Sequence, residues 1–448
     1  MHPDEARLRK AAIHSQSSAA FMNIAVIGSG ISGLSAAYCL GQRHRVVLFE
    51  ADGRVGGHTN TIEVPLADGG VQPVDTGWIV YNAINYPNLT ALFGELEVQT
   101  RPTSMSFGVS LGDGAYEWKG SDNLLSVFAQ PANVFSPRHI RMLLDILKLN
   151  RRCGALLKMG ILPGGTLGDF LDSSGFSPWL ASRYLLPMAG LIWSCSPKKA
   201  REYPAADFMR FFDSHSLFTA TGQPTWHTVV GGSHAYVKKI LARLRGDLRL
   251  NTPVLRVERA ADGAHITTAA GSERFDAVVL ATHSSTSLRL LADASADERA
   301  VLQGIPYNQS RCVLHTDERW LPRRRAAWAC WNYLNPVDEV HDRPIIGSYW
   351  MNLLQGIQGD VNYIVTLNPP REIDPARVLY DTVYEHPHYG PASVETHRRL
   401  PSVQGRGGVW FAGAWTAYGF HEDGLKSGLR AVSGIDRDCL PRWAVLPA

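Results

Sequence analysis

The stretch from Met22 to Thr61 constrains the fold of this chain more than any other. It reads "MNIAVIGSGISGLSAAYCLGQRHRVVLFEADGRVGGHTNT", the pattern of a buried strand, a glycine turn, a helix and a second buried strand. In such a turn Gly28 permits the tight bend, Gly30 lets the backbone approach a pyrophosphate, and Gly33 lets the helix pack close to the strand. The pattern predicts a Rossmann-like α/β fold that binds a dinucleotide.

Two features beside the turn indicate where the phosphates and a ribose would lie. Ile31 and Ser32 open the helix, whose free N–H groups and partial positive charge suit a diphosphate. Glu50 ends the second strand, where a carboxylate accepts hydrogen bonds from ribose hydroxyls and repels a 2′-phosphate. We therefore expect NAD or FAD rather than NADP. The alternative is a glycine-rich turn in an ordinary α/β protein.

Length and composition exclude several other classes of protein. A chain of 448 residues is too long for one ordinary core, so we expect two domains or one large elaborated domain. The net charge of +3 gives no support for nucleic-acid binding. The six cysteines are scattered without a CxxC pair, which indicates reduced thiols, a cytoplasmic location and no metal site.

The absence of several sequence motifs excludes further classes of protein. The sequence has no HExxH helix and no Walker loop, so the metalloprotease and P-loop classes are excluded. No apolar run is long enough to span a bilayer. Residues 1–21 lack the apolar core of a signal peptide, and we expect them to form a disordered leader. Because there is no second GxGxxG unit for NAD(P)H, we expect electrons to pass to O2 or another acceptor.

Three later segments resemble the successive motifs of the flavin amine oxidase superfamily. "EADGRVGGHTNT" begins at Glu50, "DTGWIVYN" begins at Asp75, and "GGVWFAGAWTAYGFHEDGLKSGLRA" begins at Gly407. The chain is most similar to a bacterial group of NAD/FAD-binding proteins, which resembles the amino-terminal flavin region of plant cyclopropane fatty acid synthases. The resemblance implies that the dinucleotide is FAD.

The resemblance also implies which residues hold FAD. Arg54 would neutralise the diphosphate, the backbone of Val254 would hold the adenine edge, and a helix starting near Glu422 would point its N-terminus at the flavin ring. The last motif contains no cysteine, so we expect the FAD to be non-covalent. The residues expected to bind it are Gly28, Gly30, Ile31, Ser32, Gly33, Glu50, Ala51, Arg54, Gly56, Gly57, His58, Thr76, Gly77, Trp78, Val254, Ala281, Thr282, Gly413, Ala414, Phe420, His421 and Glu422.

The implied architecture is α/β: a discontinuous FAD-binding domain of the glutathione-reductase and amine-oxidase type, with an inserted α+β substrate domain. Residues 22–85, 225–298 and 402–437 would form the first, and residues 86–224 and 299–401 the second. Within the second, residues 138–160 are basic and apolar with an approximate helical period. Such a helix either packs on the domain core, which we favour, or makes weak contact with a membrane surface.

A flavin of this class accepts a hydride at N5, while the protein positions the substrate and excludes water. Relatives often place a lysine against N5, whereas the segment "SRCVLHTDERW" offers Arg311. An aromatic flank for the reacting group is expected at Phe420, with Trp415 and Tyr418 nearby, although each ring could equally be core. These four residues are our catalytic candidates, and we assign no general base.

Four histidines are further candidates. His58 follows the Gly-Gly pair where relatives commonly carry arginine, and it either contacts the flavin or caps a turn. His283, His315 and His421 lie in segments expected near the active site, although a structural role is the commoner one for a histidine.

Three functions fit these expectations. The first is an FAD-dependent, amine-oxidase-like oxidoreductase that takes a hydride from a C–H bond of a small organic molecule. The second is a desaturase or saturase of the same fold that acts on a lipid or isoprenoid. The third is a flavin-binding partner of a lipid methyltransferase without turnover of its own. A long apolar tunnel would favour the second, and a short pocket caged by two aromatic rings the first.

Overall fold

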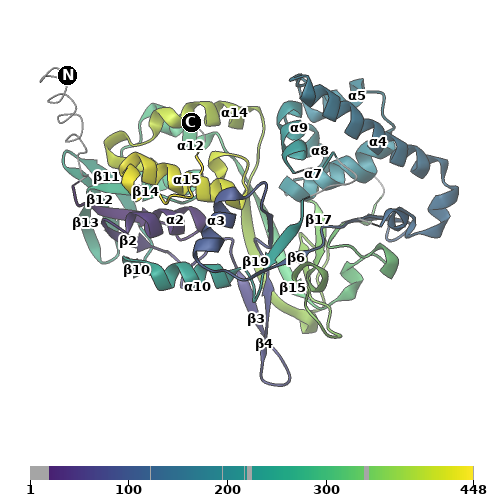
Figure 1. Cartoon of the computed structure of the whole chain (residues 1–448), viewed down its shortest axis with the longest axis horizontal. Helices are drawn as coiled ribbons and strands as arrows, with labels where there is room; N and C mark the ends of the chain where they lie inside the picture. Colours follow the sequence, from purple (N-terminus) through teal and green to yellow (C-terminus); the bar gives the residue numbers. More distant parts are fainter. Residues whose placement is uncertain are drawn as a thin grey trace, which may run out of the picture.

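The computed structural model describes residues 20–121, 123–193, 195–215, 217–218, 224–337 and 343–446. All but the last two residues of the expected disordered leader, 1–21, lie outside this range. Figure 1 shows two parts side by side: a layered sheet-and-helix part that contains both ends of the described chain, and a second sheet with a group of helices beside it.

A parallel five-stranded sheet forms the first part. Four of its strands are mostly apolar runs buried on both faces, as expected where layers cover a parallel sheet on both sides, whereas one edge strand is polar and partly exposed. In spatial order they are β10 (Asp247–Arg249), β2 (Arg45–Phe49), β1 (Asn23–Ile27), β14 (Ala277–Leu280) and β20 (Val409–Phe411). Sequence positions far apart thus meet in one sheet, and the expected Rossmann-like α/β fold is confirmed.

Helices and a small sheet cover the two faces of these strands. One face carries α2 (Ile31–Leu40), α10 (His234–Arg243) and α15 (His421–Ile435), whose apolar residues share a core with alternate strand residues. The other face carries an antiparallel sheet of β11 (Arg256–Ala260), β12 (Gly263–Thr268) and β13 (Gly271–Phe275).

Two glycines let α15 pack closely against α2. A Cβ on Gly424 would lie 2.8 Å from Cγ2 of Ile31, and one on Gly428 would lie 2.3 Å from the carbonyl oxygen of Ser32. The first and last helices of this part are therefore in direct contact along their N-terminal turns.

Helix α3 (Pro87–Glu95) belongs with this part as well, although we assigned residues from 86 onward to the substrate domain. Leu89, Leu92 and Phe93 are buried in the same core as α10 and α15, and the Phe93 ring lies 5.3 Å from the Tyr236 ring. An amphipathic helix belongs to the part in which its apolar face is buried. The boundary between the first part and the inserted part therefore lies after α3 in the sequence.

A seven-stranded sheet forms the second part, which has the expected α+β character. All neighbouring strands are antiparallel except β16 and β7. In spatial order the strands are β19 (Val378–Pro387), β15 (Tyr307–His315), β18 (Ile364–Leu367), β17 (Ile346–Trp350), β16 (Trp331–Asn335), β7 (Phe107–Leu111) and β8 (Tyr116–Gly120).

Helices lie beside one end of this sheet, as Figure 1 shows. The principal ones are α4 (Pro137–Lys158), α5 (Leu167–Ser173), α7 (Leu186–Trp193), α8 (Pro197–Arg201) and α9 (Ala205–Ser214). Among the described residues, no helix combines the length and apolarity needed to cross a bilayer.

Two small sheets connect the parts. The hairpin of β3 (Thr61–Pro65) and β4 (Val71–Asp75) follows the loop after β2. The strands β5 (Val80–Asn82), β9 (Trp226–Val229) and β6 (Thr100–Thr103) form a three-stranded sheet between the first part and the second.

A match to the serine-hydrolase pattern GxSxG at residues 108–112 lies in β7 and the turn after it, not at a strand-to-helix turn. Ser110 is buried, and its hydroxyl donates to Oε1 of Glu117 at 2.9 Å on the neighbouring strand. This serine is therefore no nucleophile elbow.

Candidate cofactor and substrate site

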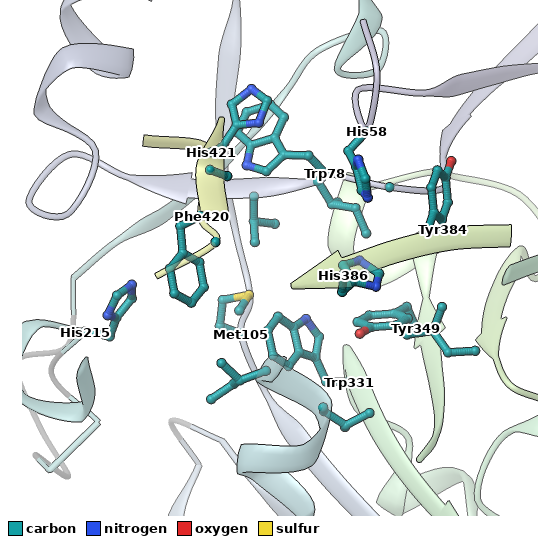
Figure 2. Close-up of a pocket in the computed structure, with 18 of the residues that line it drawn as sticks. His58, Trp78, Met105, His215, Trp331, Tyr349, Tyr384, His386, Phe420 and His421 are labelled. Carbon is teal, nitrogen blue, oxygen red and sulfur yellow. The ribbon is translucent and has the colours of Figure 1, made fainter. Parts of the chain in front are cut away.

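A cavity of about 1260 Å³ runs between the two parts of the molecule. One end is lined by the glycine turn after β1 and by Glu50, and the other end by α4 and α7. The middle is lined by β17, β19 and the segment before α15, and Figure 2 shows its side chains.

The three glycines of the first turn have two different roles. Gly28 has φ +98°, and a Cβ there would lie 2.6 Å from the carbonyl oxygen of Ala281, while one on Gly33 would lie 1.8 Å from the carbonyl oxygen of Gly28. A Cβ on Gly30 would instead meet no atom within 4 Å, because that position faces the cavity. Gly28 and Gly33 thus serve packing, whereas Gly30 leaves backbone accessible.

The N-terminus of α2 opens toward this end of the cavity. Its N-cap, Gly30, makes no side-chain cap bond, and no acid lies in its first turn, so its first N–H groups and positive end stay available for an anion. Close by, the Glu50 carboxylate accepts hydrogen bonds from the Ser29 and Asp52 backbone N–H groups, each at 3.0 Å, and from the Ser29 hydroxyl. We call this end of the cavity, where the open N-terminus of α2 and the Glu50 carboxylate lie side by side, the cradle end.

Arg54 has a different position from the one expected of a phosphate ligand. It does not line the cavity, and its guanidinium donates to the carbonyl oxygens of Gly57 at 2.9 Å and Thr59 at 3.0 Å. Gly56 and Gly57 do line the cavity, and a Cβ on Gly57 would lie 3.1 Å from Cα of Gly30. Arg54 therefore orders this loop against the glycine turn. A direct contact with phosphate stays a prediction.

Ala51 and Val254 also lie outside the set of residues that line the cavity. Ala51 is exposed, and Val254 is buried in the core beneath the small antiparallel sheet. A contact between the Val254 backbone and adenine stays a prediction.

Histidines and tyrosines occupy the middle of the cavity on the β19 side. The His58 ring lies 5.0 Å from the Tyr384 ring and 5.3 Å from the His386 ring, and Figure 2 shows the three gathered there. Burial lowers the pKa of His386 to about 4, and burial with neighbouring histidines lowers the pKa of His58 well below its usual value. Both imidazoles are therefore neutral at pH 7, and Nδ1 of His386 is buried without a partner among the described residues.

A second cluster links the loop after β4 to the start of α15. The Trp78 ring stacks on the His421 ring at 4.2 Å, and Nε2 of His421 lies 2.8 Å from the Tyr236 hydroxyl. That hydroxyl lies 2.7 Å from Oγ1 of Thr59. Burial lowers the pKa of His421 to about 3, so the first residue of α15 is neutral.

The two acids in the first turn of α15, Glu422 and Asp423, accept hydrogen bonds from backbone N–H groups and do not line the cavity. Asp423 accepts from the Phe420 N–H at 3.1 Å, and burial raises its pKa to about 6. The buried Glu422 carboxylate accepts from the backbone N–H groups of Asn88 at 3.1 Å and Leu89 at 3.0 Å. The assignment of its side chain as a cofactor ligand is wrong, because the carboxylate is bound by the start of α3 and does not line the cavity.

Two catalytic candidates also lie outside the cavity. Arg311 pairs with Asp381 at 2.7 Å and Glu372 at 3.2 Å on the outer face of β15, whereas its neighbour Cys312 faces inward and donates to the carbonyl oxygen of Thr76 at 3.3 Å. Successive strand residues point to opposite faces, so Arg311 points away from the interior and its assignment fails. Tyr418 is 36% exposed and lines no part of the cavity, so its assignment fails as well.

The other two aromatic candidates do line the cavity. Phe420 stacks on Phe211 with ring centres 4.8 Å apart. Trp415 is almost fully buried, and its indole N–H donates to the carbonyl oxygen of Thr282 at 3.0 Å, so it mainly braces the loop. Of the remaining histidines, His283 lines the cavity, whereas His315 is buried away from it against Thr366.

Most of the remaining expected cofactor residues line the cavity. They are Ile31, Ser32, Thr76, Gly77, Trp78, Ala281, Thr282, Gly413 and Ala414.

The α4–α7 end of the cavity was not recognised from the sequence. Its wall comes from Leu143, Ile146 and Leu147 on α4, and from Met188, Leu191 and Ile192 on α7. Each trio has the i, i+3, i+4 spacing of one helix face, but this spacing is equally typical of a helix that packs in a core. The sequence pattern therefore carried no signal for a cavity wall.

Charged side chains are confined to the other regions of the cavity. Among the described lining residues the acids are Glu50 and Asp52 at the cradle end and Glu385, which pairs with His283 at 3.1 Å. No lysine or arginine lines the cavity in the described ranges. The wall formed by α4 and α7 is therefore uncharged, and it is apolar except for Asn150 of α4, whose Oδ1 is buried without a partner among the described residues.

Known proteins are similar to this chain in sequence and in fold. A protein of Mycobacterium tuberculosis named as a flavin-containing monoamine oxidase, AofH, is 27% identical over 274 residues, which cover 58% of this chain and 56% of that protein. The carotenoid phi-ring synthase of Streptomyces griseus is 27% identical over 292 residues, covering 60% of this chain and 54% of the synthase. The matches thus span little more than half of these curated relatives.

Among solved structures, the CLA-producing fatty acid isomerase from P. acnes superposes with a TM-score of 0.65 at 17% identity, covering 92% of this chain and 98% of the isomerase. This similarity shows a shared fold. The family model described as flavin containing amine oxidoreductase matches residues 31–435, so the chain belongs to the flavin-containing amine oxidoreductase family.

Proposed function

We propose that the cavity holds FAD non-covalently, with the diphosphate at the N-terminus of α2, a ribose at Glu50, and the flavin ring in the middle region. The open position at Gly30, the uncapped helix and the adjacent acid fit such a molecule. Trp78 Nε1 and His386 Nδ1 are buried polar atoms of the middle region that have no partner among the described residues. None of the described cavity-lining residues is a cysteine, which supports non-covalent binding.

We propose further that the protein is an FAD-dependent oxidoreductase whose substrate is an elongated apolar molecule, a fatty acyl lipid or an isoprenoid. Bound FAD would accept a hydride from a C–H bond of that substrate and pass the electrons to O2 or another acceptor. The observation that carries the proposal is the uncharged wall of α4 and α7, because an ammonium ion held there would lose its hydration without a counter-ion.

The chain's own side chains position the substrate and exclude water. Phe420, Trp331 and Tyr349 line the passage between the middle region and the apolar end, and Figure 2 shows them around one space with Met105. Rings of this kind hold an acyl chain by apolar contact. The neutral His386 can exchange a hydrogen bond or a proton with a bound molecule at Nδ1, and we assign no obligatory general base.

An amine oxidase is the second candidate. The sequence similarity to AofH and the rings of Tyr384 and Tyr349 in the middle region favour it. A flavin-binding partner of a lipid methyltransferase is less well supported, because the cavity continues well beyond the region proposed for the ring. The described cysteines are all buried free thiols, which suits the reducing cytoplasm that we propose as its compartment.

Anaerobic bleaching of the bound flavin tests the proposal. The purified protein should be yellow, release its flavin on acid precipitation, and be bleached by fatty acyl lipids or polyenes but not by simple amines. Bleaching by amines alone would assign the second candidate. A colourless, folded protein that takes up no added FAD would end the flavin assignment.

A further inference from the structure

Exposed apolar side chains gather on α4 and on the two short helices before it, η1 (Leu124–Phe128) and η2 (Pro131–Phe135). Phe135 is 87% exposed and Leu144 is 57% exposed. Figure 1 shows α4 along the outer edge of the molecule. We call this surface the apolar rim, and its residues are Leu125, Val134, Phe135, Ile140, Leu144 and Leu147. Val134, Phe135, Ile140 and Leu144 together line one surface hollow, and contiguous exposed apolar surface of this kind marks an interaction site.

The apolar rim borders the α4–α7 end of the cavity. Leu147 is 51% exposed and also lines the cavity, while Leu143 and Ile146, on the adjoining side of α4, form the cavity wall. Ile140, Leu144 and Leu147 have i, i+4, i+7 spacing and so form one stripe on the outside of the helix. Helix α4 therefore carries the cavity wall and the apolar rim next to each other, and the half-exposed Leu147 belongs to both.

The exposed charges of α4 are all positive. The helix has six basic residues, Arg138, Arg141, Lys148, Arg151, Arg152 and Lys158. Its single acid, Asp145, is buried and is already engaged by Arg141 at 3.2 Å and by the backbone N–H of Ser177 at 2.9 Å. A helix with an apolar stripe beside a basic face suits the interface of a bilayer that contains anionic lipid.

We propose that the apolar rim docks on the surface of an anionic lipid bilayer, so that an apolar substrate passes from the membrane into the cavity beside Leu147. The inference rests on the proposed function, because it gives a water-insoluble substrate a route that avoids water. A second copy of this chain is a poorer occupant, because a symmetric contact would bring two basic α4 faces together.

Vesicle sedimentation tests this docking. The full-length holoprotein should bind vesicles of phosphatidylcholine with about 30% phosphatidylglycerol, bind pure phosphatidylcholine vesicles more weakly, and be released as NaCl rises from about 0.1 to 0.5 M. The double variant Phe135→Ser/Leu144→Ser should lose on the order of 100-fold in partition coefficient, because two buried apolar side chains are removed.

The chain offers a closely matched control. Phe21 is 72% exposed and Leu255 is 58% exposed, both on the other part of the molecule, so Phe21→Ser/Leu255→Ser should bind vesicles as the wild type does. A charge variant, Arg138→Gln/Arg151→Gln/Lys158→Gln, should bind anionic vesicles on the order of 10- to 100-fold more weakly. Equal losses in the control and rim variants would overturn the proposal.

A second measurement separates this inference from the proposed function. Bleaching of the flavin by a water-soluble short-chain acyl substrate, without vesicles, should be the same in the wild type and the rim variant, since neither Phe135 nor Leu144 lines the cavity. Bleaching without any vesicle binding would overturn the docking alone, and vesicle binding without bleaching by any lipid would overturn the proposed function alone. A dimer in sedimentation velocity that Phe135→Ser/Leu144→Ser dissociates would assign the apolar rim to a second copy instead.

Discussion

The two ends of the cavity are built on opposite principles. The cradle end is shaped by backbone: a glycine turn, an uncapped helix and one acid at a strand end. The α4–α7 end is shaped by the size of apolar side chains on helices. A backbone-shaped site requires particular residues at fixed positions, whereas a wall of side chains accepts many apolar residues. The first kind of site is therefore specific in sequence, and the second can vary its ligand while the fold stays the same.

The largest effect is expected where the backbone itself lines the cavity. Gly30→Asp puts a carboxylate into open space, so the variant should fold yet bind FAD on the order of 100-fold more weakly, because the new charge repels the diphosphate. Absorbance of the purified protein and titration with FAD measure this. Gly164→Asp, at another glycine with no atom within 4 Å of its Cβ position, is the control.

The neighbouring Gly33 should respond differently. Because a Cβ there would lie 1.8 Å from a carbonyl oxygen, Gly33→Ala should lower the free energy of unfolding by about 3 kcal/mol with or without flavin. Loss of flavin from Gly33→Ala at unchanged stability would contradict the division of roles within the turn.

The next effect is expected at the other end of the cavity. Met188→Trp fills the apolar wall, so bleaching by a long-chain lipid should slow about 10-fold while flavin content and bleaching by a short-chain substrate stay unchanged. The exposed Met159 provides the control variant Met159→Trp. If both chain lengths slowed equally, the α4–α7 end would not be the chain-binding region.

A smaller effect concerns the neutral histidines between the two ends. The folded-state pKa of His386 is about 4, below the 6.5 of the unfolded chain. Its contribution to stability is therefore present above about pH 6.5 and is lost as the pH falls toward 4, because the unfolded state binds the extra proton. His386→Gln should make the fall in unfolding free energy shallower by up to about 1.4 kcal/mol per pH unit in that window.

Urea unfolding at a series of pH values measures this slope. His265→Gln, on the exposed side of β12, is the control. An unchanged slope in His386→Gln would mean that His386 is not held neutral in the folded protein.

The smallest effect is expected outside the cavity. Arg311→Gln removes surface ion pairs to Asp381 and Glu372, so it should cost less than about 1 kcal/mol of stability. Flavin content and bleaching rates should match the wild type. A loss of bleaching would return Arg311 to the active site and contradict the observed strand register.

The same division explains what the sequence could predict. The parallel sheet, the glycine turn, the Asp-Gly hairpin at 262–263 and the final strand and helix were all predictable, because each depends on local backbone requirements. Arg311 was misplaced because a one-residue change of register exchanges the two faces of a strand. Glu422 was misplaced because its partner, the start of α3, is more than 300 residues distant in sequence.

The apolar wall and the His58–Tyr384–His386 group were beyond prediction for a related reason. They are assembled from elements whose relative placement depends on tertiary packing, and no spacing within one segment reports it. The expected domain boundary before α3 was wrong for the same reason, because only the burial of the apolar face of α3 shows which part the helix belongs to.

The close contact of α15 with α2 has a consequence for how the protein is made. The first strand and helix leave the ribosome early, but they lack the covering helix that fixes their N-terminal turn until the last strand and α15 have been synthesised. We therefore expect cofactor uptake to be a late, post-translational step, and nascent chains that stall before residue 421 to remain colourless.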